Sequence, residues 1–133
     1  MTKEAKLIEA AIEASKRAYA PYSKFFVGAA LETTEGEIIS GCNVENASYG
    51  LTNCAERTAL FSAFAQGKRT FKRMALFVDH HEFIFPCGAC RQVLIELAPK
   101  IEILVVKGDR EVKKVKPTDL MPYSFTADQL DDR

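Results

Sequence analysis

The chain has 133 residues, with 18 Lys and Arg balanced by 18 Asp and Glu, so its formal net charge is zero. This length predicts a single domain over residues 1–133 that buries a hydrophobic core of its own. A neutral chain gains little affinity by neutralising phosphates, which argues against a nucleic-acid partner. No apolar run approaches the roughly 18–20 residues that span a bilayer, so no membrane partner is expected.

The N-terminus, Met1–Lys6, is charged and does not resemble a secretory signal. The expected compartment is therefore a reducing cytoplasm. Four cysteines in such a compartment are more typical of metal ligands or a reactive site than of a disulfide framework.

Apolar residues at helical spacing predict a first helix over residues 3–19, with Thr2 as its N-cap and Pro21 as its stop. Strand 74–78 is continuously apolar, which favours a central place in a sheet. The order of elements predicts an α/β fold in three layers, α/β/α, with a mixed five-stranded sheet. In chain order we expect helix 3–19, strands 25–31 and 37–44, a loop at 43–53, helix 54–66, strand 74–78, helix 87–98, strands 101–106 and 111–115, and a short helix at 126–130.

Two segments with cysteines carry the chemistry, Cys54-Ala55-Glu56 and Pro86-Cys87-Gly88-Ala89-Cys90. Both fall where a helix is predicted to begin, and the spacing of Cys87 and Cys90 places their sulfurs on one face of a first turn. Free N–H groups and the positive end of a helix favour the thiolate, which is the form that binds zinc. Three cysteines in this pattern suit a catalytic zinc site, because such a site uses three protein ligands.

A closed structural zinc site needs a fourth ligand, and Cys42 is the remaining cysteine. We interpret Cys42, at the end of a predicted strand, as a small buried hydrophobic residue. The catalytic interpretation instead uses Glu56, which lies about 200° around the helix from Cys54 and so beside the metal rather than on it. Taken alone, Glu56 would be an exposed helix carboxylate or a partner for Arg57. A thioredoxin-like redox pair has no use for the glutamate.

At this point the sequence resembles the zinc-dependent deaminases, whose three-cysteine pattern it matches. The resemblance is to the small class of cytidine deaminases, and it extends from about residue 4 to residue 130. The segments that carry it are Ala20–Phe25, Val27–Ala30, Gly41–Tyr49, Asn53–Ala59, Cys87–Val93 and Leu120–Phe125.

The resemblance implies hydrolysis of free cytidine and deoxycytidine to uridine and deoxyuridine with release of ammonia, a reaction of pyrimidine salvage. It implies one Zn²⁺ per chain and a homotetramer with sites at subunit interfaces. Cys54, Cys87 and Cys90 would bind the zinc, and Glu56 would move protons. By the same resemblance Asn43 and Glu45 would hold the ribose hydroxyls, and Phe25 would pack on the pyrimidine. The backbone of Ala55 would hydrogen-bond to the base, and Arg57 would hydrogen-bond to a ligand sulfur. Phe125 would reach the site of a neighbouring subunit.

The sequence pattern alone leaves the roles of some of these residues open. Asn43 would otherwise be a turn residue, Glu45 a solvated loop charge, and Phe125 a locally packed apolar residue. Neighbours on a strand face opposite ways, so one of Phe25 and Phe26 is expected to be core.

The sequence departs from the family in one loop, which usually carries small residues and a serine before the proline. Here the loop reads His80-His81-Glu82-Phe83-Ile84-Phe85. The backbone carbonyl of Phe85 can still accept a hydrogen bond from the leaving amine. His80 and His81 are interpreted as loop residues, because three thiolates and a water complete a tetrahedral zinc site.

Three rival functions remain at this point. A deaminase of another amine, such as a nucleoside antibiotic, would share the same motifs. An editor of bases within a polynucleotide is opposed by the neutral charge and by the lack of an aromatic and basic platform. A non-catalytic zinc module would require Cys42 on the metal.

Overall fold

The computed structural model describes residues 1–131, so the last two residues of the predicted 1–133 domain lie outside the described residues. Its sheet has five strands in the order β2-β1-β3-β4-β5, and β3 is central, as its continuous apolarity predicts. The elements are α1 (Lys3–Ser15), β1 (Val27–Thr33), β2 (Ile38–Cys42), the 3-10 helix η1 (Tyr49–Leu51), α2 (Ala55–Ala65), β3 (Phe71–Val78), α3 (Gly88–Leu97), β4 (Glu102–Val106), β5 (Val112–Val115), α4 (Pro117–Leu120) and α5 (Ala127–Asp131).

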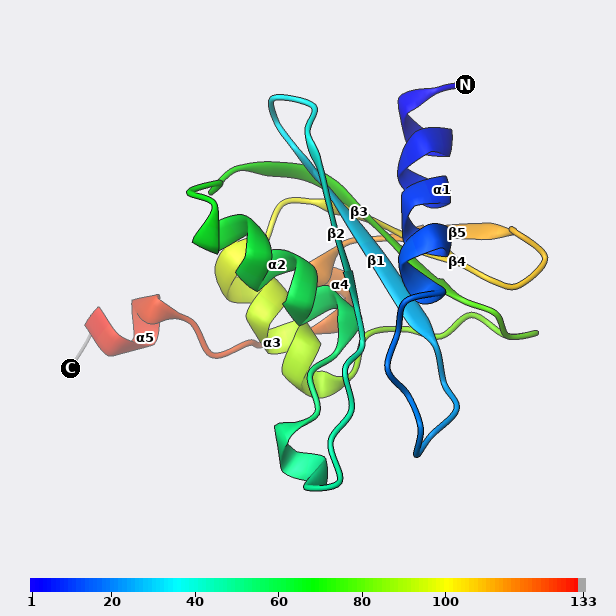
Figure 1. Ribbon diagram of the computed structural model, residues 1–133. Helices are drawn as coiled ribbons and strands as arrows, with labels where there is room; N and C mark the ends of the chain where they lie inside the picture. The colour runs from blue at the N-terminus through cyan, green and yellow to red at the C-terminus, as the bar shows by residue number, and fades with distance from the viewer. Residues whose placement is uncertain (132–133) are drawn as a thin grey trace.

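The sheet is mixed because only β3 and β4 run parallel, with α3 as the crossover between them, while the other neighbours pair antiparallel. Figure 1 shows α2 and α3 on one side of the sheet and α1 on the other. The predicted three-layer α/β/α fold is therefore confirmed. No helix within residues 1–131 is long and apolar enough to cross a bilayer.

The three central strands place alternate residues on the two faces of the sheet. On β1, Ala29 and Leu31 pack with α2 and α3, whereas Ala30 packs with α1. The same alternation continues along β3 and β4. Each face therefore has its own apolar cluster, which explains why the central strands read as continuously apolar.

The first helix ends at Ser15, four residues before its predicted end. Beyond it, Tyr19 pairs with a distant loop: its N–H donates to the carbonyl of Asn43 at 3.0 Å, and its carbonyl accepts from the N–H of Glu45 at 2.9 Å. These long-range hydrogen bonds hold the backbone at Tyr19 in an extended conformation, so the helix ends earlier than the spacing of its apolar residues predicts.

The first strand begins at Val27, two residues later than predicted, because the side chain of Asn43 lies across its start. The N–H of Val27 donates to Asn43 Oδ1 at 2.9 Å, and Asn43 Nδ2 donates to the carbonyl of Phe25 at 2.7 Å. The other predicted elements begin and end within three residues of their expected bounds. The helices η1 and α4 were not predicted.

Two strand glycines allow helices to approach the sheet closely. A Cβ on Gly41 would lie 2.5 Å from the backbone nitrogen of Ala59 in α2, and a Cβ on Gly28 would overlap the backbone of α1. Helix α2 can therefore lie against β2 only because residue 41 has no side chain.

Gly41→Ala is expected to lower the free energy of unfolding by about 2 kcal/mol or more, because the methyl group pushes α2 away from the sheet. Gly50→Ala is the matched control, since a Cβ there meets nothing within 4 Å. Chemical denaturation of both variants measures the difference. Equal stability of the two variants would contradict the close packing.

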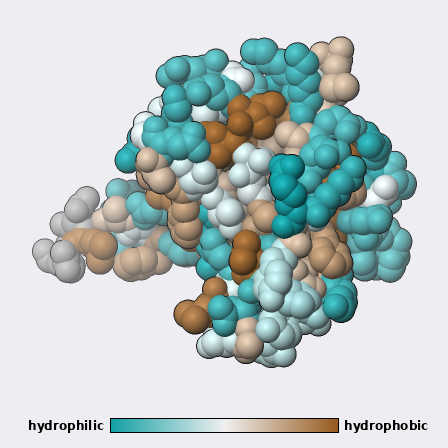
Figure 2. Space-filling view, viewed as in Figure 1, coloured by the Kyte–Doolittle hydropathy of each residue, from teal (hydrophilic) through white to brown (hydrophobic). Residues whose placement is uncertain are grey.

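Several large apolar side chains lie at the surface, and some belong to the loop around η1 and to the C-terminal tail. Tyr49 is 75% exposed, Leu51 71% and Phe125 59%. Figure 2 shows hydrophobic residues on the surface at the loop that carries η1 and along the projecting C-terminal segment. Monomeric proteins rarely expose large apolar patches without a function, so these segments are candidates for contacts with another chain.

Candidate active site

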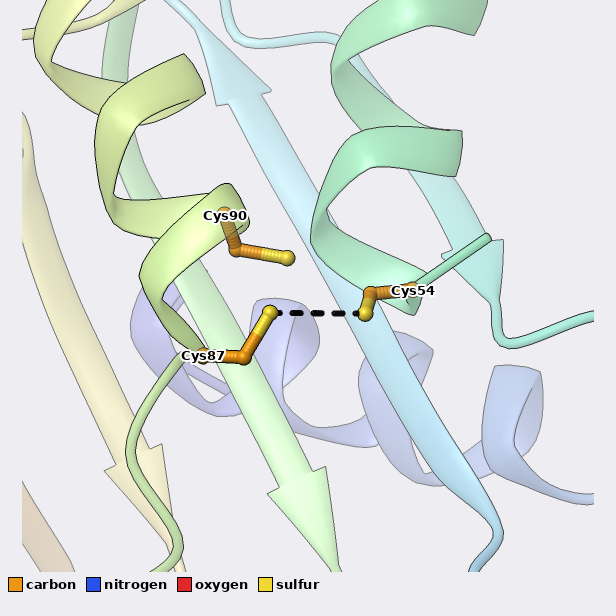
Figure 3. Close-up of side chains that lie close together, drawn as sticks. All are labelled: Cys54, Cys87 and Cys90. Atoms are coloured by element: carbon orange, nitrogen blue, oxygen red, sulfur yellow. Dashed lines mark hydrogen bonds between the residues drawn. The ribbon is translucent and has the colours of Figure 1, made fainter. Parts of the chain in front are cut away.

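The three predicted cysteine ligands meet at the N-termini of two neighbouring helices. Cys54 is the N-cap of α2, Cys87 is the N-cap of α3, and Cys90 lies in the first turn of α3. Figure 3 shows their sulfur atoms pointing toward one another. The three sulfurs therefore converge, as the spacing of the cysteines in the sequence predicts.

The donor set fits a zinc ion. Tetrahedral Zn–S bonds of about 2.3 Å place two ligand sulfurs about 3.8 Å apart. The Sγ atoms of Cys54 and Cys87 are 3.7 Å apart, and all three sulfurs lie within 4.8 Å of one another. Within residues 1–131, Cys42 does not belong to this group. A closed four-cysteine site, which the non-catalytic alternative requires, is therefore not supported.

The surroundings of the sulfurs favour the thiolate form. Hydrogen bonds from the Cys90 thiol and from Arg57 lower the pKa of Cys54 to about 5, against the opposing effect of burial. The Arg57 Nη2 atom donates to Cys54 Sγ at 3.3 Å. Both helix N-termini add positive potential at the same point. Because three thiolates on Zn²⁺ carry a net charge of −1, Arg57 offsets part of that charge.

Glu56 lies in the first turn of α2 and is only 4% exposed. Its carboxylate is not part of the sulfur group. Burial raises the pKa of Glu56 to about 7, and the negative charge of Cys54 acts in the same direction. A carboxyl group with such a pKa near a metal site is suited to accept and release protons at neutral pH.

A cavity of about 400 Å³ opens beside the sulfurs, and it collects side chains from β1, β3 and several loops. Within the described chain it contains two carboxylates and no lysine, arginine or histidine. Its lining residues are Ser23, Phe25, Val27, Asn43, Glu45, Thr52, Cys54, Ala55, Glu56, Leu76, Val78, Ile84, Phe85 and Cys87.

Asn43 and Glu45 both line this cavity, and both are held by backbone groups. The amide of Asn43 is hydrogen-bonded to Phe25 and Val27, which leaves it one N–H and one lone pair. The carboxylate of Glu45 accepts from the N–H groups of Tyr22 and Ser23 and from the Ser23 hydroxyl. The hydrogen bond from the Ser23 hydroxyl lowers the pKa of Glu45, so this group is an acceptor.

The prediction that one of Phe25 and Phe26 is core is wrong. Phe25 is partly buried and lines the cavity, whereas Phe26 is 45% exposed. Both precede β1, so the alternation of a strand does not apply to them. Ala55 is fully buried at the start of α2, where first-turn N–H groups have no partner within the helix.

Phe125 does not line the cavity of its own chain. It lies in the C-terminal tail, and Gln92 in α3 donates to its backbone carbonyl at 2.9 Å. The side chain is thus left exposed beside α3. Figure 1 shows the tail leading away from the body of the protein to α5.

Some cavity residues were not predicted from the sequence. Leu76 and Val78 on β3 line the cavity, although their apolar run was interpreted as core. Ser23 and Thr52 lie in polar loops without a distinguishing pattern. Ile84 and Phe85, from the loop that departs from the family pattern, form an apolar part of the wall.

Arg91 fastens the turn before Cys87, a role that its sequence position did not reveal. Its Nε donates to the carbonyl of Pro86 at 2.7 Å, and its Nη1 donates to the carbonyl of Leu120 at 3.0 Å. The helix start that carries two of the sulfurs is thereby tied to α4.

Comparisons with known proteins agree with this geometry. Residues 1–106 match the family model described as "Cytidine and deoxycytidylate deaminase zinc-binding region". A cytidine deaminase of Halalkalibacterium halodurans is 48% identical over 129 residues, covering 95% of this chain and 96% of the relative. The crystal structure of cytidine deaminase from Burkholderia pseudomallei has a TM-score of 0.89 at 55% identity, covering 94% of this chain and 100% of that one.

A more distant relative has another substrate in its name. The blasticidin-S deaminase of Bacillus cereus is 32% identical over 128 residues, covering 90% of each chain.

The chain belongs to the zinc-dependent cytidine and deoxycytidylate deaminase family. Within that family its similarity is to cytidine deaminases along nearly the whole chain. Zinc is held by the triad of Cys54, Cys87 and Cys90.

Proposed function

We propose that this chain hydrolyses free cytidine and deoxycytidine to uridine and deoxyuridine and releases ammonia. It is a zinc-dependent cytidine deaminase, a hydrolase. One observation carries the proposal: Cys54 and Cys87 of the zinc triad and the buried Glu56 border a single cavity of about 400 Å³, which is large enough for a nucleoside. We propose one zinc ion per chain and a cytoplasmic location, where reduced thiols persist.

When bound, zinc lowers the pKa of a coordinated water from 15.7 toward about 7 and so supplies a nucleophile at neutral pH. The protons are moved by Glu56, which accepts one from water and donates it to ring N3 of the pyrimidine. After attack at C4, the carboxylate takes the proton of the new C4 hydroxyl and passes it to the amine. The C4–N bond then breaks, ammonia leaves, and the C4–O bond becomes the carbonyl of uridine. The carbonyl of Phe85, in the cavity wall, accepts a hydrogen bond from that amine.

The other cavity residues suit a nucleoside. Asn43 offers a donor and an acceptor and Glu45 an acceptor, which match a pair of ribose hydroxyls. The ring of Phe25 packs on the pyrimidine. The free backbone groups at Ala55 hydrogen-bond to the edge of the base.

The charge of the cavity favours a substrate without phosphate. Two carboxylates line it, and within the described chain no cationic side chain does. A nucleotide would bring its phosphate near negative charge without a compensating lysine or arginine. This supports a free nucleoside rather than a nucleotide or a polynucleotide.

A deaminase of a nucleoside antibiotic is the second candidate. The apolar residues Ile84 and Phe85 in the wall and the similarity to blasticidin-S deaminase favour it. A panel of cytidine, deoxycytidine, 5′-CMP and blasticidin S, with release of ammonia as the readout, distinguishes the two functions. We expect turnover of the two free nucleosides and its loss after removal of zinc with a chelator. Turnover of blasticidin S alone would reject the proposal.

We further propose a homotetramer in which Phe125 completes the site of a neighbouring subunit. The ring of Phe125 is exposed and does not line the cavity of its own chain. The tail that carries it leads away from the body of the protein. The exposed apolar residues of the η1 loop are candidates for the subunit contacts.

Mixing two inactive variants, Glu56→Gln and Phe125→Ala, is expected to restore activity. Random assembly places an intact glutamate beside an intact phenylalanine at about a quarter of the sites. The assay follows cytidine turnover after subunit exchange, and a fluorescent label on one variant verifies that exchange. No recovery after verified exchange would show that Phe125 does not act between subunits.

A further inference from the structure

A second group of metal-binding side chains lies in the loop after β3. The ligand atoms of His80, His81 and Glu82 lie within 4.8 Å of one another. These are the only two histidines of the chain, and neither belongs to the cysteine triad. From the sequence we expected loop residues, because the catalytic zinc needs no further protein ligand. We propose that this group binds a second divalent transition-metal ion, separate from the catalytic zinc.

The loop already holds the two imidazoles together. The rings of His80 and His81 are stacked with centroids 4.3 Å apart. The backbone N–H of His80 donates to the carbonyl of Val78 at 2.9 Å, and the backbone carbonyl of His80 accepts from the N–H of Gly108 at 2.9 Å. The segment is thus fastened both to β3 and to the turn between β4 and β5. A chelate that forms here has little backbone freedom left to lose.

The surroundings carry additional negative charge. A hollow beside the loop is lined by His80 and His81 together with Asp79 and Asp109. The carboxylate of Asp79 lies over Gly108, where a Cβ would be 2.5 Å from its Oδ1 atom. Asp109 is already paired with Lys107 at 3.5 Å, so the charge that favours a cation over an anion here comes chiefly from Asp79.

The donor types select the class of metal. Two imidazole nitrogens and one carboxylate oxygen suit Zn²⁺, Ni²⁺ or Cu²⁺, whereas Mg²⁺ and Ca²⁺ require oxygen donors. The N–H of Glu82 donates to His80 Nδ1 at 3.0 Å, so an ion bound through Nδ1 displaces this hydrogen bond, whereas Nε2 can bind without losing it. The other two ligands, His81 and Glu82, are exposed to solvent. We therefore expect the second ion to be held more loosely than the catalytic zinc and to exchange with solvent.

The second site lies next to the catalytic cavity. The ring of His80 is 6.0 Å from that of Phe25, which lines the cavity. The loop continues from Glu82 into Ile84 and Phe85 of the cavity wall. An ion on this loop therefore restrains the segment that shapes one side of the cavity.

Equilibrium dialysis of the zinc-loaded protein against Ni²⁺, with analysis of both metals, tests the proposal. We expect one Ni²⁺ per chain to bind while the zinc content stays unchanged. The variants His81→Asn and Glu82→Gln are each expected to weaken Ni²⁺ binding about tenfold or more. Glu37→Gln is the control and should bind as the parent does, because this exposed carboxylate pairs with Lys68 at the opposite end of the sheet.

A second measurement does not depend on the variants. Because the chain has two histidines, its ¹⁵N spectrum contains two imidazole spin systems. Both should shift together during titration with one equivalent of Zn²⁺ beyond the catalytic ion, and neither should shift with Mg²⁺. Absence of saturable Ni²⁺ uptake, displacement of the catalytic zinc by Ni²⁺, or a response of only one imidazole would overturn the proposal.

Discussion

Glu56→Gln is expected to lower kcat for cytidine about 10⁴-fold or more, at the upper end of the range for one acid–base group. In the proposed mechanism the same carboxyl group moves protons in successive steps, whereas an amide cannot accept a proton from water. Glutamine has nearly the same shape, so the packing around this buried position and the sulfur triad should persist. Steady-state turnover at saturating cytidine measures the loss.

Zinc content and thermal stability must be measured on the same Glu56→Gln sample. Both should match the parent, because the carboxylate is not part of the sulfur group. Glu96→Gln on the exposed surface of α3 is the matched control and should keep full activity. Substantial turnover by a zinc-replete Glu56→Gln protein would refute the assignment of the proton carrier.

The metal centre could be predicted from the sequence because its geometry is local. Two short segments each begin a helix. Side chains in a helix tilt toward its N-terminus, so a cysteine at the N-cap or in the first turn directs its sulfur beyond that terminus. Only the approach of α2 to α3 requires long-range information. Gly41 lets α2 approach the sheet, but a glycine in a strand is no evidence of such a contact until the fold is known.

The parts that sequence reasoning missed depend on contacts between distant segments. The end of α1 is set by pairing of Tyr19 with the loop at Asn43, and the start of β1 by the side chain of the same asparagine. Local spacing carries no information about such partners. Leu76 and Val78 show a similar limit, because an apolar strand residue that faces a cavity has the same pattern as one that faces the core.

Phe26 shows how a local rule fails when its premise is wrong. Alternation of side chains requires an extended strand, but Lys24 has a φ of 59° and β1 begins only at Val27. The two phenylalanines therefore belong to an irregular entry segment, in which Phe25 faces the cavity and Phe26 faces outward.

Cys87→Ser is expected to weaken zinc binding about 100-fold or more and to lower turnover in proportion to the lost metal. A serine hydroxyl stays protonated at neutral pH, so it replaces an anionic sulfur with a weak neutral ligand. The change should not destabilise α3, because Cys87 is the N-cap of this helix and serine is a better N-cap than cysteine. Loss of zinc would thus report on the metal centre and not on a frayed helix.

The matched control for Cys87→Ser is Cys42→Ser, since Cys42 lies outside the sulfur group within residues 1–131. Dialysis of both variants against a chelator of graded strength, followed by metal analysis, compares their zinc affinities with that of the parent. Cys42→Ser should retain its zinc and its turnover. If Cys42→Ser instead lost zinc as Cys87→Ser does, the ion would have four sulfur ligands, leaving no coordination position for water, and hydrolysis at this centre would be untenable.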